Sequence, residues 1–191
     1  MSVIDETLLE QRWYTERLLL RAPQPGDAVH IYHLARDRRV SEMLLNMPHP
    51  YERYEADAWV ERARVRIESG EGLPLVIVRR ADDQLIGSVG LWPNYLHRRA
   101  ELGYWLGVTY WGRGYMSEAV QTMIDFGFAE LGLNRIFATY FTNNPASMRV
   151  MLKCGMVFEG VQRQAVIKWG EARDLGMCAI LRQDWLRRKQ P

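Results

Sequence analysis

Two glycines enclose an arginine directly before a helical pattern, and this spacing is suited to binding a phosphate group. The stretch reads Gly112, Arg113, Gly114, and apolar residues at helical spacing follow it. A helix N-terminus presents unpaired N–H groups and a partial positive charge to an anion. Glycine lets the backbone approach a ligand closely and adopt positive φ, and Arg113 adds a cation. A tight strand-to-helix turn without any ligand is the alternative interpretation.

Two common nucleotide-binding motifs do not fit this stretch. A P-loop needs Gly-x-x-x-x-Gly-Lys followed by Ser or Thr, and the sequence contains no such string. A Rossmann fingerprint needs a third small residue, here Ser117, and should open near the start of a strand–helix–strand unit. Three strands with an antiparallel pattern come first in this chain. Both motifs are therefore excluded.

The sequence around the glycines resembles a known family. RAELGYWLGVTYWGRGYMSEAV (residues 99–120) and NNPASMRVMLKCGMVFEG (residues 143–160) are similar to segments of the GNAT superfamily of acetyl-CoA-dependent N-acetyltransferases. Within that superfamily the chain most resembles the ribosomal-protein (Rim-type) N-terminal acetyltransferases. The likeness covers nearly the whole chain. It implies an enzyme that moves an acetyl group from acetyl-CoA, its cosubstrate, to a primary amine, without a metal.

The resemblance assigns the glycine motif to the pyrophosphate of acetyl-CoA. The family pattern is Gln/Arg-x-x-Gly-x-Gly/Ala, which places Gly114 at the central glycine. Trp111 and Met116 depart from the commonest residues at the two ends, although the backbone N–H groups stay available. The residues expected at the pyrophosphate are Arg113, Gly114, Tyr115, Met116 and Ser117.

The same resemblance implies a binding strand for the pantetheine arm of the cofactor. The arm is expected to pair with Trp105, Leu106 and Val108, and the Trp105 N–H to polarise the thioester carbonyl. Asn144 and Ser147 match family positions near the pantetheine and the sulfur.

Amine acetylation needs a neutral amine and a proton for the leaving thiolate. Strand alternation places Glu101 on one face with Gly103 and Trp105, where its carboxylate points along the expected cofactor channel. We therefore predict Glu101 as the general base, with an ion pair to a neighbouring arginine as the alternative. Ser147 is the predicted acid or donor to the sulfur, with a solvated helix serine as the alternative. Tyr104 falls on the opposite face, where we expect core packing.

The elements that must position these residues follow from hydrophobic periodicity. We predict strands at residues 16–22, 73–80, 84–92, 99–107 and 135–142, and a final hairpin turning at residues 169–171. Helices are predicted with Asp27 as the cap of the first, Gly70 ending the second, Gly132 after the third and Asn144 capping the fourth. This order predicts an α/β fold with a mixed, mostly antiparallel central sheet, helices on both faces and a splayed cofactor-binding strand.

The composition sets limits on the class of protein. A chain of 191 residues with 48% hydrophobic and 25% charged residues is typical of one globular domain, predicted over residues 1–191 with residues 1–14 as a possible extension. A net charge of +2 does not favour nucleic acid. The sequence shows no signal peptide or membrane span, and it has only two cysteines, so we expect a cytoplasmic protein. His30 and His33 lack further ligands at metal-binding spacing.

The acceptor amine is not determined by the sequence. A protein N-terminus of the ribosomal-protein type is the first expectation, and a polyamine, amino acid or drug is the second. A non-catalytic CoA-binding regulator and an interaction module are the other hypotheses. Four acidic residues flank the LLNMPHP stretch at residues 44–50 and could attract a cationic amine: Glu42, Glu52, Glu55 and Asp57. Monomer and homodimer both stay open.

Overall fold

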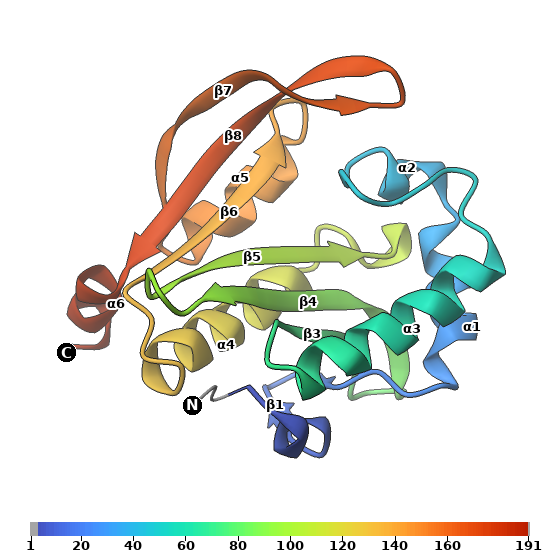
Figure 1. Cartoon of the computed structure of the whole chain (residues 1–191), viewed down its shortest axis with the longest axis horizontal. Coiled ribbons are helices and arrows are strands. Elements are labelled where there is room, and N and C mark those ends of the chain that lie inside the picture. Colours follow the sequence, from blue (N-terminus) through green and yellow to red (C-terminus); the bar gives the residue numbers. More distant parts are fainter. Residues whose placement is uncertain (1–3, 191) are drawn as a thin grey trace.

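An eight-stranded sheet runs through the centre of the molecule, and helices cover both of its faces (Figure 1). The computed structural model describes residues 4–190, so residues 1–3 and 191 of the predicted domain lie outside the described range. The strand order is β1-β2-β3-β4-β5-β6-β8-β7. The strands are β1 (Arg12–Tyr14), β2 (Leu18–Arg21), β3 (Leu73–Arg79), β4 (Gln84–Asn94), β5 (Arg99–Leu106), β6 (Arg135–Phe141), β7 (Val157–Lys168) and β8 (Glu171–Leu181).

The helices form two layers around this sheet. Helices α1 and α3 pack on one face, where a buried cluster includes Ile31 and Val60. Helix α4 covers the other face and contributes Met123 and Phe128 to the larger core, while α5 packs beside α4 and against β6 to β8. The helices are η1 (Glu6–Leu9), α1 (Asp27–Ala35), α2 (Arg38–Ser41), α3 (Arg53–Glu68), η2 (Val108–Tyr110), α4 (Tyr115–Ala129), α5 (Pro145–Lys153) and α6 (Arg182–Lys189).

The sheet opens between β5 and β6. These two strands form a parallel pair within an otherwise antiparallel sheet, and their pairing ends at Glu101 and Phe137. Beyond that point β5 continues to Leu106 and β6 to Phe141 without pairing to each other, so the strands diverge in Figure 1. The predicted α/β class is confirmed, including the mixed, mostly antiparallel sheet, the helices on both faces and the splayed strand.

Local sequence signals fix the elements around this opening. Asn144 caps α5 by accepting a hydrogen bond from the Ser147 N–H (3.2 Å), and Pro145 follows at the first turn, as predicted. Trp169 and Gly170 form the turn between β7 and β8, with φ of 51° and 82°. A two-residue hairpin turn with both φ values positive matches the right-handed twist of the strands. The start of α5 and the turn between β7 and β8 therefore follow from local residue preferences.

The structure corrects three expectations about the elements. Strand β1 and helices η1, α2 and α6 were not predicted. Asp27 does not cap α1, because Gly26 stands at that position and the Asp27 carboxylate instead binds the Arg21 guanidinium (2.7 and 2.8 Å) and the Gln24 N–H (2.7 Å). Residues 4–14 are not an appendage, since β1 pairs with β2 and Ile4 is fully buried in the core.

Candidate active site

The open edge of β5 presents backbone groups to the gap. The Gly107 N–H donates to the Ile86 carbonyl (2.9 Å), and alternate residues of an antiparallel strand direct their peptide groups to the same side. Trp105, which lies opposite Ser88, therefore also points its peptide groups towards β4. The Leu106 N–H consequently faces the gap. The register thus corrects the expectation that the Trp105 N–H would face a bound thioester.

The two unusual residues of the glycine motif have structural roles. The Trp111 indole Nε1 donates to the Leu106 carbonyl (2.9 Å), which ties the loop to the end of β5. The Trp111 N–H donates to the Val108 carbonyl (3.2 Å), so Val108 lies in a turn beyond the strand. Met116 is buried in the core beneath the first turn of α4. The Trp111 and Met116 side chains are therefore both engaged away from the backbone N–H groups of the glycine motif.

The glycine motif leaves the N-terminus of α4 open to a ligand. Gly114 adopts left-handed φ of 80° at the N-cap and offers no side-chain cap. The helical hydrogen bonds begin with the Glu118 N–H donating to the Gly114 carbonyl (3.2 Å). The preceding N–H groups, those of Tyr115, Met116 and Ser117, have no acceptor within the helix. These donors are suited to a phosphate.

Arg17 and Glu118 hold this motif against the start of β2, and sequence reasoning missed both. The Arg17 guanidinium forms an ion pair with the Glu118 carboxylate (2.7 Å), donates to the Arg113 carbonyl (3.0 Å) and lies over the Tyr115 ring at 4.7 Å. Glu118 also accepts hydrogen bonds from the Arg17 N–H (2.9 Å) and the Thr15 hydroxyl. Burial alone would raise the pKa of Glu118, but these hydrogen bonds outweigh it and lower the pKa. About a hundred residues separate the partners, so no local pattern could reveal the pair.

A hollow of about 480 Å³ opens beside the motif. Its lining carries three cationic side chains, those of Arg17, Arg113 and Lys153, and one carboxylate, that of Glu118, which is paired with Arg17. The open helix N-terminus and the cations together fit the pyrophosphate of a CoA molecule. Cys154 also lines the hollow, where its thiol contacts the Ser117 carbonyl (3.4 Å) and burial raises its pKa to about 11. The thiol is therefore neutral near pH 7 and is a poor nucleophile.

Glu101 lies between two aromatic side chains at the edge of the gap. Its cross-strand neighbours on the same face are Trp92 of β4 and Phe137 of β6. Gly103 has no side chain to displace the Trp92 ring, since a Cβ there would lie 2.9 Å from that ring. Partial burial raises the pKa of Glu101 above its ordinary value. A carboxylate with a raised pKa is a better proton acceptor at neutral pH.

No hydrogen bond or ion pair joins Glu101 to another residue within the described range 4–190. The neighbouring arginines, expected as its alternative partners, are engaged elsewhere: Arg98 donates to the Gly132 carbonyl (2.9 Å), and Arg99 lies over the Phe137 ring at 5.8 Å. This geometry contradicts the ion-pair alternative for Glu101.

Tyr104 and Ser147 meet on the opposite face of β5. The Tyr104 hydroxyl lies 2.9 Å from the Ser147 hydroxyl and donates to the Ser147 carbonyl (3.1 Å). Burial raises the pKa of Tyr104 well above its ordinary value, so the phenol stays protonated. Tyr104 packs against the core as predicted, but its hydroxyl also fixes the first turn of α5, which sequence reasoning missed. The Asn144 side chain serves this same turn as its cap.

The gap between β5 and β6 can be reached from both faces of the sheet. Glu101 lies on the face of α1 and α3, whereas Tyr104 and Ser147 lie on the face of α4 and α5. A proton acceptor on one side and a hydroxyl donor on the other suit a group transfer between two ligands that meet in the gap. Among residues 4–190 no cluster of three or more His, Cys, Asp or Glu could hold a metal ion.

The comparisons with known proteins agree with this geometry. The family model described as acetyltransferase (GNAT) domain matches residues 17–157. The N-acetyltransferase YoaA of Bacillus subtilis (strain 168) is 33% identical over 171 residues, which cover 88% of this chain and 95% of that protein. The spermidine N(1)-acetyltransferase of Vibrio cholerae is 26% identical over 175 residues, covering 91% of this chain and 98% of that protein.

A solved structure shows the same fold. The ribosomal-protein-S5-alanine acetyltransferase of Vibrio fischeri superimposes with a TM-score of 0.80 at 22% identity, over 92% of this chain and 99% of that chain. The shared fold therefore extends past the residues matched by the family model and into the C-terminal hairpin.

Proposed function

The chain belongs to the GNAT acetyltransferase family and is an acetyl-CoA-dependent N-acetyltransferase, and from this premise we propose that its acceptor is the α-amine of a protein N-terminus. The observation that carries the proposal is the carboxylate of Glu101, which has no hydrogen-bond or ion-pair partner within residues 4–190 and lies between the Trp92 and Phe137 side chains. Relatives named for ribosomal proteins and for spermidine both occur, so their names do not decide the acceptor.

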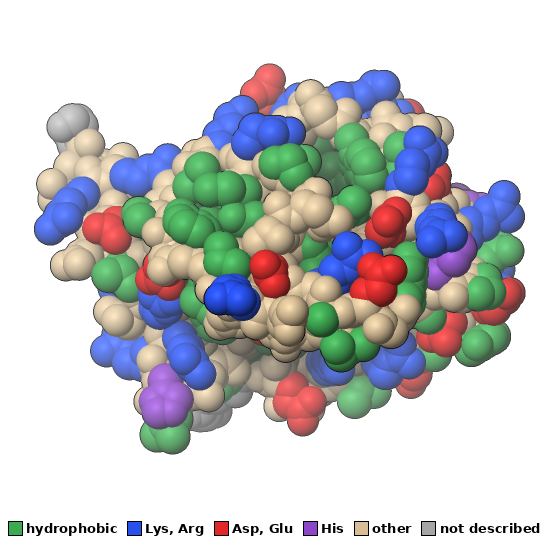
Figure 2. Space-filling model, turned by 90° about the horizontal axis from the view of Figure 1, so that it is seen from above, with side chains coloured by type: hydrophobic (Ala, Val, Ile, Leu, Met, Phe, Trp, Pro, Cys, Tyr) green, Lys and Arg blue, Asp and Glu red, His purple; other side chains and the backbone are tan. Residues whose placement is uncertain are grey.

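The charges on the Glu101 face favour a monocationic acceptor. Arg99 lies over the Phe137 ring at 5.8 Å, and Arg38 lies over Trp169 at 5.3 Å on the hairpin tip, whereas Arg135, also 5.8 Å from the Phe137 ring, is paired with Glu159. Figure 2 shows the molecule from above, with Lys and Arg side chains along its upper margin and both basic and acidic side chains towards its right. A polyamine brings several positive charges and would be repelled by such a rim. A peptide N-terminus brings one, which Glu101 can neutralise.

The acidic residues that flank residues 44–50 do not change this conclusion. Asp57 forms an ion pair with Arg53 (3.2 Å) on the exposed side of α3, and Glu52 and Glu55 are at the beginning of the same helix. Glu52 and Asp57 are exposed and Glu55 is half-buried, and salt screens the attraction of the exposed carboxylates for a distant amine.

In the proposed mechanism each residue has one task. Acetyl-CoA supplies the thioester when it is bound. Glu101 accepts the proton of the incoming ammonium, directly or through one water, so that the neutral amine can attack. The Leu106 N–H would donate a hydrogen bond to the acetyl carbonyl oxygen of bound acetyl-CoA. The Ser147 hydroxyl would supply a proton to the departing sulfur of CoA and regain one from solvent, and Tyr104 would hold that hydroxyl in place.

The proposal extends to the residues that hold the cofactor. The pyrophosphate lies on the segment from Arg113 to Ser117, through Gly114, Tyr115 and Met116, and the pantetheine follows β5 past Trp105, Leu106 and Val108 towards Asn144. The chain 1–191 acts as one domain in the cytoplasm, and a ribosomal-protein N-terminus is the first candidate partner.

The acceptor is tested by following CoA release with two sets of amines. We expect efficient turnover of short peptides beginning with alanine or serine, and weak turnover of spermidine at equal concentration. Efficient turnover of spermidine without turnover of the peptides would refute the proposed acceptor.

The base is tested with Glu101→Gln, which keeps the shape and removes the basicity. We expect turnover to fall about a hundredfold near neutral pH, the usual contribution of a general base, with acetyl-CoA affinity unchanged. The loss shrinks as pH rises, because solvent then deprotonates the amine. Glu61→Gln, on the exposed surface of α3, is the matched control. Normal turnover of Glu101→Gln at neutral pH would remove Glu101 from the mechanism.

A further inference from the structure

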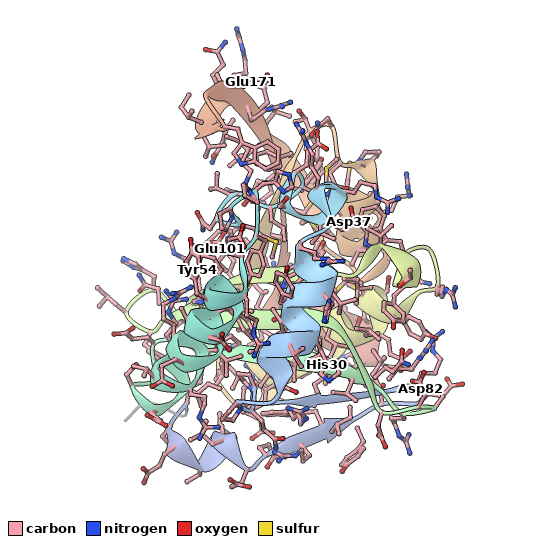
Figure 3. The ribbon with its side chains drawn as sticks, turned by 90° about the vertical axis from the view of Figure 1, so that its right-hand side faces the viewer. His30, Asp37, Tyr54, Asp82, Glu101 and Glu171 are labelled. Carbon is pink, nitrogen blue, oxygen red and sulfur yellow. The ribbon has the colours of Figure 1, made fainter. Side chains whose placement is uncertain are left out.

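The hairpin of β7 and β8 extends beyond the sheet that carries it. Pairing between β6 and β8 ends at Phe141 and Leu175, but β8 begins four residues earlier, at Glu171. At about 3.3 Å per residue, the hairpin overhangs the end of β6 by about 13 Å. Figure 3 shows this overhang from the side, with Glu171 at its tip above Asp37, the residue that caps α2.

A bulge bends the hairpin where it leaves the sheet. Gln162 pairs with Leu175 and Val166 with Arg173, so residues 163–165 lie opposite Asp174 alone. The Gln164 N–H donates to the Asp174 carboxylate (2.7 Å), which fixes the extra residues. Bulges bend a strand and increase its twist. The overhang is thereby directed towards the loop between α2 and α3.

Lys168 joins the hairpin tip to that loop. Its ammonium donates to the Leu45 carbonyl (3.2 Å) and the Met47 carbonyl (2.6 Å), and it lies 4.7 Å from the centre of the Trp169 ring. Lys168 is only 5% exposed. A buried ammonium is costly unless its protons find acceptors. Here two carbonyls more than 120 residues away, together with an indole ring, supply that compensation.

Other groups face Trp169 from the α2 side and complete the contact. The Arg38 guanidinium lies 5.3 Å from the Trp169 ring centre, and the His49 ring lies 5.7 Å away. Burial lowers the pKa of Lys168, in agreement with an ammonium removed from water. The Lys168 side chain is therefore held by specific protein partners and is not solvated.

The contact lies at the open end of the gap between β5 and β6. Met47, whose carbonyl binds Lys168, packs on the same cluster as Trp105 of β5. Met47 and Lys168 therefore connect that cluster to the hairpin, while β8 and β6 lead back to β5 at the Glu101–Phe137 pair. We expect an acceptor that approaches Glu101 from the open end of the gap to pass this contact.

We propose that Lys168 is a specificity-determining residue, which latches the hairpin over the gap so that only an acceptor slender next to its amine reaches Glu101. This inference rests on the proposed function, because it concerns the same acceptor. The latch selects acceptors by the bulk of the groups next to the amine. This selection does not depend on the charge of the acceptor. It explains why the chain buries a lysine at the tip of an otherwise exposed hairpin.

The latch is tested first without any acceptor. The intact protein is treated with an amine-reactive N-hydroxysuccinimide ester, and modification of each lysine is followed by mass spectrometry. Lys153 and Lys189 are exposed and serve as internal references. We expect Lys168 to react at least about tenfold more slowly, because reaction requires local opening. A rate equal to that of Lys153 would show that the latch does not form in solution.

Selectivity is tested with two peptides that differ only in their first residue, alanine or tryptophan. The unaltered enzyme is expected to prefer the alanine peptide, and Lys168→Met, which removes the donors and keeps the stem, to reduce that preference about tenfold. Trp169→Ala, at an exposed position, should act in the same direction if Lys168→Met folds poorly. Lys189→Met on α6 is the matched control.

The outcomes separate the latch from the proposed function. An unchanged peptide preference in both variants, with lower thermal stability, would show that the contact is structural only and would overturn the inference. If neither peptide is acetylated while another amine is, the proposed function fails, and the labelling rates decide the latch by themselves.

Discussion

Glu118→Gln tests whether the pair with Arg17 supports the glycine motif. The Glu118 carboxylate accepts hydrogen bonds from the Thr15 hydroxyl, the Arg17 N–H (2.9 Å) and the Arg17 guanidinium (2.7 Å). The Glu118 side chain is 17% exposed. Hydrogen bonds to a charged group contribute about 1.5–3 kcal/mol each when buried. Arg17 is 42% exposed, and glutamine keeps one acceptor oxygen, so we expect a total loss of about 2 kcal/mol. This lowers the Tm by about 4–8 °C.

The stability difference between the unaltered protein and Glu118→Gln should depend on pH. The folded-state pKa of Glu118 lies below its ordinary value of 4.5. A carboxyl whose pKa is lowered by folding stabilises the protein above the unfolded pKa, and this stabilisation is lost as the pH falls through the folded pKa. The difference between the two proteins should therefore be complete at neutral pH and small below the folded pKa, where Glu118 is protonated.

Urea denaturation at neutral pH and at the lowest pH where both proteins fold measures this difference. Calorimetric titration with acetyl-CoA should also show several-fold weaker binding, because Arg17 no longer holds the Arg113 carbonyl. Glu61→Gln, on the exposed surface of α3, controls for the loss of one negative charge. A stability difference that is equal at both pH values would refute the reasoning.

Two further substitutions probe the two ends of the cofactor site. Gly114→Val should abolish the thermal stabilisation by CoA, because a β-branched residue is strained at φ of 80° and the phosphate loses its approach to the helix N-terminus; a full thermal shift in this variant would contradict the site. Tyr104→Phe should lower kcat about tenfold with little change in the KM for acetyl-CoA, the size expected when one aligned hydrogen bond is lost. Combined with Ser147→Ala it should add almost nothing if both act through the hydroxyl pair; additive losses in the double variant would show that Tyr104 acts independently of the Ser147 hydroxyl, through packing or through its bond to the Ser147 carbonyl.

Local chemistry makes much of the fold readable from the sequence. The cap at Asn144, the turn at Trp169 and Gly170, and the left-handed Gly114 each depend on residues only a few positions apart. Strand alternation is also sufficient to place Glu101 and Tyr104 on opposite faces of β5. These features follow from backbone preferences that act within one turn or one strand.

The elements that escaped prediction lack such local signals. β1 has three residues, and its pairing with β2 holds it in the sheet. α6 is almost entirely polar, so it shows no apolar stripe; its Trp185 packs against the Phe128 ring (5.5 Å between centroids) and donates to Asp125 (2.6 Å). A helix of eight residues is marginal without such contacts.

The sequence by itself determined the family, the open helix N-terminus and the candidate base, because these depend on residue type and short spacing. Only the tertiary structure decided that the Leu106 amide faces the gap, that Glu118 binds Arg17, that Tyr104 contacts Ser147, and that Lys168 binds the Met47 carbonyl. Each of these depends on strand register or on partners tens of residues apart. Periodicity states which face a side chain takes, but it carries no information about which distant residue meets it there.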